Sequence, residues 1–279
     1  MAGAIMPIAL LRSNDFAERL NQSTSIEDLR SLEIEILDYL KNDPDDSVTA
    51  MITLIGCYIG LNDIENAELI VHECYKLIKR NIPFNLAIYK TMIENIKGNK
   101  KEAVAILMKL IKNNKLTEGE RIKVFVHLIV YNSNLAYFEE MYTNVVELWN
   151  MINHNTKIDF DDDSFYSKVS KYSDSRVLFK VMDKLKSYLN GKELLKDDDK
   201  YSEIYKYVKD YTKDNLLIED IIPYEEVDIE FPDIKYFSLK LISKPMYVQE
   251  RHNLEIQITK LIESNYPQVL VLVDVIVRT

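Results

Sequence analysis

The apolar positions between Val48 and Trp149 recur at helical spacing and describe one helical hairpin three times. The segment Asn62–Ala67 aligns with Gly98–Ala103 at a period of 36 residues, and the weaker Ser133–Phe138 follows 35 residues later. Periods of this length are typical of stacked helical repeats. Because one hairpin cannot bury its apolar face alone, neighbouring hairpins stack on it and together leave an extended surface. The pattern therefore predicts a helical solenoid.

Helical spacing continues on both sides of these repeats. Before them, Leu29, Leu32 and Ile36 form one apolar stripe behind a polar start at Ser23–Ser25, which indicates a helix with one buried face. The apolar run Ala4–Leu11 is expected to be a packed helix or an ordered arm. Further helices are expected at about residues 48–59, 64–80, 118–131, 136–152, 164–172, 175–189 and 200–211. The helical pattern ends near residue 213.

The pattern changes to alternation near Glu225. Three short runs alternate apolar and polar residues, as half-buried strands do, and a fourth is almost wholly apolar, as in a central strand covered on both faces. The runs are Val227–Phe231, Phe237–Leu241, Leu254–Ile258 and Val269–Val277. They predict an antiparallel sheet of about four strands. The alternative is a helix over Gln249–Glu263, because Leu254, Ile258 and Leu261 also share one helical face.

Together the two patterns predict a mainly α fold, an α-solenoid of stacked antiparallel helical hairpins with a small C-terminal β or α/β domain. We expect the solenoid over residues 1–215 and the β-rich domain over residues 216–279. A few strands without helices have too little core to stand alone. The sheet is therefore expected to pack on the end of the solenoid, on a partner, or on sequence beyond Thr279.

The first of these hairpins resembles the tetratricopeptide repeat family. Leucine and tyrosine on the first helix, a turn residue, and two small residues on the second helix are matched by Leu54, Tyr58, Asn62, Ala67 and Cys74. Ile55 departs from the pattern, because the family has glycine there. The second hairpin keeps Gly98 and Ala103 but has Glu94 in place of tyrosine. The sequence from Ile82–Asn85 onward is also similar to the pentatricopeptide family, whose members bind single-stranded RNA.

The tetratricopeptide resemblance implies a groove lined by the first helix of each hairpin. Such a groove takes a peptide or a helix of another protein, in which apolar anchors supply most of the binding energy. In this register the groove would be lined by Thr49, Ile52, Gly56, Tyr89, Met92, Asn95, Lys123, His127 and Tyr131. Lys123 is the only lysine or arginine in that set, so the clamp that some members of the family place on C-terminal carboxylates is not expected.

The formal net charge of the chain is −10 at pH 7. This charge disfavours nucleic acid as a partner, because binding to phosphates requires clustered lysine and arginine. RNA binding through the repeats is therefore a minor alternative. Acidic residues concentrate between residues 197 and 233, a segment that contains 13 acidic and four basic residues. This segment is interpreted as a solvated connector, or as a docking surface for a basic partner.

A second alternative function is a divergent metal-dependent nuclease or other hydrolase on the C-terminal sheet. Asp233 and Glu255 would hold Mg²⁺ on neighbouring strands, and Lys260 would stabilise charge at the phosphate. Gln257 stands where restriction-type nucleases carry lysine. The competing interpretation of these residues is a set of solvent-facing positions on amphipathic strands.

The remaining polar residues do not favour catalysis. The four histidines are scattered without the spacing of metal ligands, and the aspartate runs at 161–163 and 197–199 are expected to begin helices. Asp274 stands alone in an apolar run. It is expected to pair with Arg251 or Arg278, to lie exposed at the sheet edge, or to mark an interface. We expect no enzyme, no metal and no cofactor.

Cysteine content and apolar run length indicate the compartment. Cys57 and Cys74 are too few for a secreted disulfide framework, so free thiols are favoured over a bridge across the hairpin. No run approaches the roughly 18 to 20 apolar residues of a membrane-spanning helix, and residues 4–11 lack the flanks of a signal peptide. The sequence predicts a cytoplasmic scaffold or adaptor, a subunit of a multi-protein complex that binds another protein.

Overall fold

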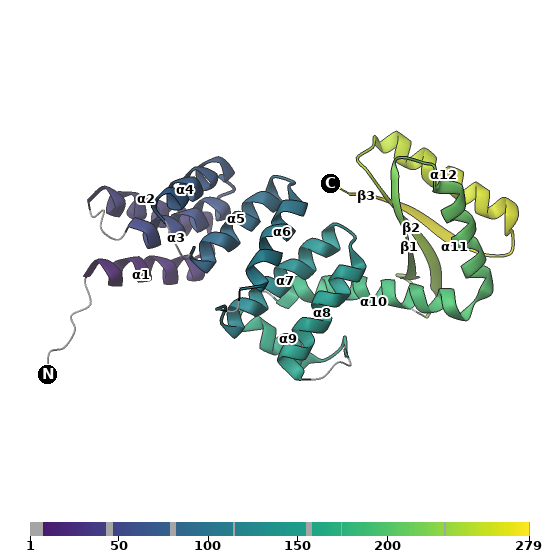
Figure 1. Ribbon diagram of the computed structural model, residues 1–279, viewed down its shortest axis with the longest axis horizontal. Helices are drawn as coiled ribbons and strands as arrows, with labels where there is room; N and C mark the ends of the chain where they lie inside the picture. Colours follow the sequence, from purple (N-terminus) through teal and green to yellow (C-terminus); the bar gives the residue numbers. More distant parts are fainter. Residues whose placement is uncertain are drawn as a thin grey trace. The chain divides into compact units, whose positions relative to one another are not determined.

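The computed structural model describes residues 8–42, 47–78, 82–113, 115–154, 158–173, 175–231 and 233–278, with side chains from residue 15 onward (Figure 1). The first residues of the apolar run Ala4–Leu11 therefore lie outside the described residues. The chain divides into two compact units, residues 1–114 and residues 115–279. These units divide at residue 114 and not at the expected residue 215, and a helix that precedes residue 215 packs directly on the first strand of the sheet.

Unit 1 is helical throughout its described elements. Its helices are α1 Ile8–Gln22, α2 Ile26–Asn42, α3 Ser47–Gly60, α4 Ile64–Leu77, α5 Phe84–Ile96 and α6 Lys100–Ile111. Helix α3 packs on α4 and α5 packs on α6, which gives two successive hairpins, while α1 and α2 both pack on α3. The core collects the apolar stripes of the sequence, with Leu32, Ile36 and Leu54 buried against Ala67 and Cys74.

The hairpins of both units turn at residues in the left-handed backbone conformation. The φ angle is 57° at Asn62, 83° at Gly98 and 53° at Ala136, and helices α4, α6 and α8 begin two residues later. The spacing from Asn62 to Gly98 confirms the 36-residue period. The third turn lies at Ala136 rather than Ser133, because the helix before it continues to Asn134. The third alignment was therefore three residues short.

Unit 2 begins with another helical hairpin and continues with further helices. Its helices are α7 Glu118–Asn134, α8 Phe138–Asn153, α9 Asp163–Ser170, α10 Ser175–Asp197, α11 Asp199–Thr212 and α12 Val248–Asn265. The side chains of Asp162 and Asp198 accept hydrogen bonds from the first backbone N–H groups of α9 and α11. These caps satisfy donors that have no partner within the helix. They confirm the expectation that both aspartate runs begin helices.

The sheet of unit 2 has the order β1-β2-β3 and is mixed. Its strands are β1 Ile218–Val227, β2 Lys235–Ser243 and β3 Val271–Val277. Strands β1 and β2 form an antiparallel hairpin, whereas β3 runs parallel to β2 after the crossover helix α12. A parallel connection requires such a crossover. In Figure 1, α11 and α12 lie over one face of the sheet.

Four details of the expected sheet were wrong, the first being its antiparallel pairing, since β3 runs parallel to β2. Residues 249–263 are helical, because Leu254, Ile258 and Ile262 place one buried stripe on the sheet. The first strand ends at Val227 instead of beginning there, so Val227–Phe231 is mainly loop. The last apolar run forms an edge strand rather than a central one. The mainly α class with a small C-terminal β part was confirmed.

Candidate functional site

The expected groove positions of unit 1 lie partly under the chain's own first helix. A Cβ atom on Gly56 would stand 2.4 Å from Cδ2 of Leu20 in α1 and 2.8 Å from the hydroxyl oxygen of Tyr89. Ile52 and Tyr89 pack against the core, and burial raises the pKa of Tyr89. Of the other positions, Thr49 is exposed, and Met92 and Asn95 are partly buried. Helix α1 therefore occupies the space beside Gly56, where the sequence predicted an open groove.

The other three groove positions belong to unit 2. His127 and Tyr131 lie one turn apart on α7, with ring centroids 5.7 Å apart, and Tyr131 is buried at 5% exposure. Burial, and next the positive charge of Lys123, lowers the pKa of His127 to about 4. His127 is therefore neutral at pH 7. Tyr131 therefore belongs to the core rather than to an open groove, while His127 and Lys123 are partly buried.

The residues of the nuclease alternative do not converge. Asp233 lies in the β1–β2 loop, whereas Glu255 and Lys260 lie on α12. Gln257 donates a hydrogen bond to the hydroxyl of Tyr211 on α11 at 2.6 Å. The neighbouring-strand geometry that the alternative required is absent, because the segment is a helix. No three His, Cys, Asp or Glu side chains of the described residues are grouped to hold a metal ion.

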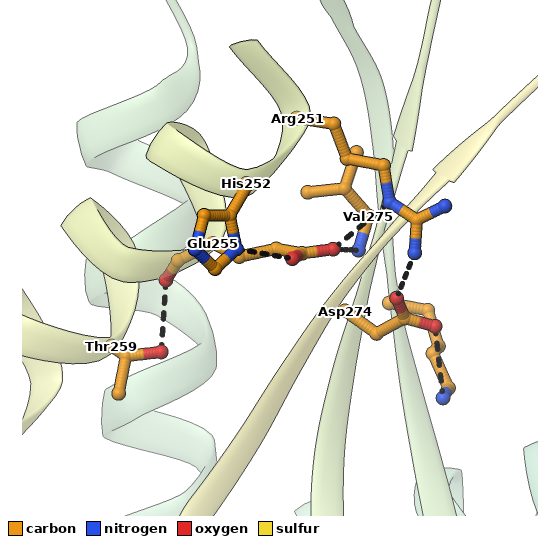
Figure 2. A network of polar contacts seen from close by, with 7 residues as sticks. Arg251, His252, Glu255, Thr259, Asp274 and Val275 are labelled. Carbon is orange, nitrogen blue, oxygen red and sulfur yellow. Dashed lines mark hydrogen bonds and ion pairs between the residues drawn. The ribbon is translucent and has the colours of Figure 1, made fainter. Parts of the chain in front are cut away.

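Glu255 instead belongs to a network of polar contacts between α12 and β3, which Figure 2 shows and which we call the edge network. Its carboxylate oxygen Oε1 accepts hydrogen bonds from the backbone N–H of Val275 at 3.1 Å and from Nε of Arg251 at 3.1 Å. Arg251 Nη2 also donates to Asp274 Oδ1 at 3.0 Å. Lys240 on β2 lies 3.4 Å from the other oxygen of Asp274 and pairs with Glu226 on β1.

The edge network decides among the expectations for Asp274. Asp274 pairs with Arg251, which was one of the expected partners, and its side chain is 38% exposed on the edge strand. Arg278 takes a different partner, Glu219, at 2.8 Å. The sequence could not reveal Glu255 as a partner of Val275, because that contact depends on α12 crossing from β2 to β3.

A second feature of unit 2 is the loop that joins β1 to β2, which we call the hairpin tip (residues 227–231 and 233–234). It exposes four large apolar side chains: Val227 at 46%, Ile229 at 96%, Phe231 at 60% and Ile234 at 44%. Between them stand Asp228, Glu230 and Asp233. The alternation was visible in the sequence, but it was interpreted as a half-buried strand.

The backbone of the hairpin tip is held in place by Asp228. Its Oδ1 accepts hydrogen bonds from the N–H groups of Glu230 at 2.8 Å and Phe231 at 2.9 Å. Its own N–H donates to the carbonyl of Ile234 at 3.0 Å. The hydrogen bonds to Phe231 and Glu230 lower the pKa of Asp228, so this acceptor is charged at neutral pH.

Comparisons with known proteins do not assign the chain to a family. No family model matches the chain, and no curated protein or solved structure matches it.

Among the described residues, none of the helices has the length and apolar character needed to cross a membrane.

Proposed function

We propose that the protein is a non-enzymatic adaptor that binds another protein, with the hairpin tip as a contact surface. The observation that carries the proposal is the exposure of Ile229 and Phe231, 96% and 60%, at the end of an ordered hairpin. Exposed apolar clusters rimmed by polar residues mark interaction sites in soluble proteins. Burying two such side chains contributes roughly 1.5–3 kcal/mol each.

The order of the hairpin tip supports this role. The hydrogen bonds to Asp228 fix the loop before a partner arrives, so less conformational entropy is lost on binding. Asp228, Glu230 and Asp233 surround the apolar side chains with negative charge. The complementary partner surface is an apolar pocket with lysine or arginine at its rim.

The tetratricopeptide-like groove is a second contact surface of the same proposed function. It is supported by the helical hairpins of both units, which share a left-handed turn residue two positions before the second helix. In unit 1 a bound peptide would lie beside α1, at Thr49 and Met92, because Leu20 fills the position at Gly56. We also propose a cytoplasmic location, since Cys57 and Cys74 are free thiols.

The proposal is tested by affinity capture of the tagged protein from its native host, with mass spectrometry of the captured proteins. The tip variant carries Ile229→Asp and Phe231→Asp and keeps Asp228. We expect it to lose at least nine-tenths of one stoichiometric protein that the unchanged chain retains. Capture of that protein should also weaken in 0.5 M NaCl, because the rim of the contact is charged.

The matched control carries Leu216→Asp and Val248→Asp, which replace two apolar side chains of unit 2 that are each 84% exposed outside the hairpin tip. It should capture the partner fully. A third variant, Thr49→Arg with Met92→Arg, tests the groove. Retention of the same partner by the tip variant would exclude the hairpin tip as the contact, and the absence of any stoichiometric protein would contradict the adaptor function.

A further inference from the structure

The outer edge of β3 carries backbone groups that point away from the sheet. Arg278 donates its N–H to the carbonyl of Ser243 on β2, whereas Val275 donates its N–H to Glu255 outside the sheet. Successive residues of a strand direct their backbone groups to opposite sides. Val271, Val273, Val275 and Val277 therefore direct N–H and C=O outward. In the described part of the chain, no strand pairs with this side.

The apolar composition of β3 favours pairing of its free edge with another strand. β3 reads Val-Leu-Val-Asp-Val-Ile-Val, and six of its seven residues are apolar. Long apolar edge strands pair with other chains unless a protein blocks them. The pattern is also symmetric about Asp274, so an antiparallel partner of the same sequence centred there would meet apolar residues with apolar residues at every position except Asp274. A second copy of this chain is thus the strand that fits best.

Glu255 stands at the position that such pairing needs. An antiparallel pair centred on Val273 would join Val271 of one copy to Val275 of the other, and one centred on Asp274 would join Val273 to Val275. Both registers use the outward N–H of Val275, which Glu255 occupies. In the second register the Asp274 carboxylates would also face each other directly, which is unfavourable.

Arg251 keeps this carboxylate in place. It donates to Glu255 at 3.1 Å and to Asp274 at 3.0 Å, so one guanidinium joins the helix side chain to the edge strand. Figure 2 shows the side chains of Arg251 and Glu255 reaching from α12 to β3. The Glu255 side chain is only 22% exposed, which indicates a packed contact and not a freely moving one.

We propose that the free edge of β3 is a self-association surface that Glu255 holds closed, and that removal of the side-chain oxygen that accepts the Val275 N–H makes the chain dimerise through antiparallel β3–β3 pairing. This inference does not depend on the adaptor function, because it concerns a second copy of the chain and a different part of the sheet.

The test is sedimentation equilibrium of the full chain over a range of concentrations. The unchanged chain and the control Glu263→Ala, an exposed glutamate further along α12, should sediment as monomers of 32.7 kDa. Glu255→Ala should sediment at twice that mass. Glu255→Gln keeps an acceptor oxygen for the Val275 N–H and should remain monomeric.

A proline identifies the surface. Val273→Pro in the Glu255→Ala chain removes an outward N–H without removing a hydrogen bond to β2, since proline is tolerated where the N–H of an edge strand faces solvent. It should restore the monomer. A dimer that survives this proline, a Glu255→Ala chain that stays monomeric, or dimerisation of Glu255→Gln as strong as that of Glu255→Ala would overturn the proposal.

A measurement on the unchanged chain covers the case in which Glu255→Ala does not fold. Amide hydrogen exchange should be at least tenfold slower at Val275 than at Val273, because only the Val275 N–H is bound by Glu255. Equal exchange at the two amides would show that Glu255 does not close the edge.

Discussion

The two edges of the sheet are closed in different ways. At the β1 edge, Tyr205 donates its hydroxyl to the carbonyl of Ile221, Pro223 has no N–H to offer, and α10 approaches the backbone at Gly191. All these groups are uncharged. At the β3 edge the closing groups are the charged side chains of the edge network. Closure by backbone packing cannot be removed without damage to the core, whereas closure by side chains can be opened while the fold remains.

The largest expected effect comes from breaking the β1 edge with Gly191→Ala. The added Cβ would lie 2.5 Å from the Tyr224 nitrogen and 2.6 Å from the Pro223 carbonyl carbon, which are backbone atoms that cannot move aside. We expect a loss of about 3 kcal/mol in the free energy of unfolding, at the upper end of overpacking costs. Urea denaturation measures it.

Gly119→Ala is the matched control for this variant. Its Cβ would lie 2.7 Å from the ring of Tyr172, a side chain that is 40% exposed and free to turn away. We expect a change within about 0.5 kcal/mol. If the two glycine variants were equally stable, α10 would not be packed against the β1 backbone.

The next effect comes from Pro223→Ala. Ile221 directs its carbonyl outward to Tyr205, so residue 223 directs its nitrogen outward as well. Alanine would place an unpaired N–H in the buried contact with α10, at a cost of about 1.5 kcal/mol. Thermal unfolding measures it, with Pro245→Ala in an exposed loop as the control. A more stable Pro223→Ala chain would mean that this edge was open to water.

Lys240→Met should cost less, about 1 kcal/mol. Its ammonium group pairs with Glu226 and Asp274, and removing it leaves both carboxylates without that partner, but each is at least 33% exposed and stays partly solvated. Denaturation in 0.05 M and 1 M NaCl measures the cost, which should shrink in high salt. Lys244→Met, at an exposed position, should leave the free energy of unfolding unchanged. A loss of stability equal to that of Lys240→Met would show that the edge network has no special role.

The smallest effect concerns salt alone. In 1 M NaCl the Debye length is about 3 Å, so the contacts that hold Arg251 against Glu255 weaken. Amide exchange at Val275 should become about two- to threefold faster, while exchange at Tyr224 in β1 should not change. Parallel changes at both amides would mean that the two edges are closed by the same kind of force.

The helices could be predicted from the sequence because their signal is local. The stripe at Leu32 and Ile36 repeats at helical spacing, and left-handed turns at Asn62 and Gly98 punctuate it. Each of these signals spans only a few residues of the chain. The third turn was misplaced because Ala136 is an unusual residue for φ of 53°, and nothing nearby marks it as a turn.

The sheet was predicted less well, because short apolar runs fit either period. Leu254, Ile256 and Ile258 alternate as in a strand, yet Leu254, Ile258 and Ile262 form the buried stripe of α12. The choice is made by tertiary structure. A parallel partner for β2 requires a crossover, and only this segment can supply it.

The candidate site was predicted only in part. Pairing of Asp274 with Arg251 was one of the expected outcomes, since a charge in an apolar strand is stabilised by a nearby opposite charge. The Glu255 contact with the Val275 N–H involves a backbone group, which no side-chain pattern reveals. The groove residues remain a prediction, and the cover that α1 places on Gly56 could not be inferred from the repeats alone.

The two thiols provide a built-in reporter. Both cysteines of the chain lie in unit 1 and are fully buried, and burial raises the pKa of Cys57 to about 12 and of Cys74 to about 11. A thiol-modifying reagent therefore reacts only when unit 1 opens, because the thiolate is the reactive form and neither sulfur is accessible when it is closed. The rate of labelling reports the local unfolding of unit 1 in the intact chain, without contribution from unit 2.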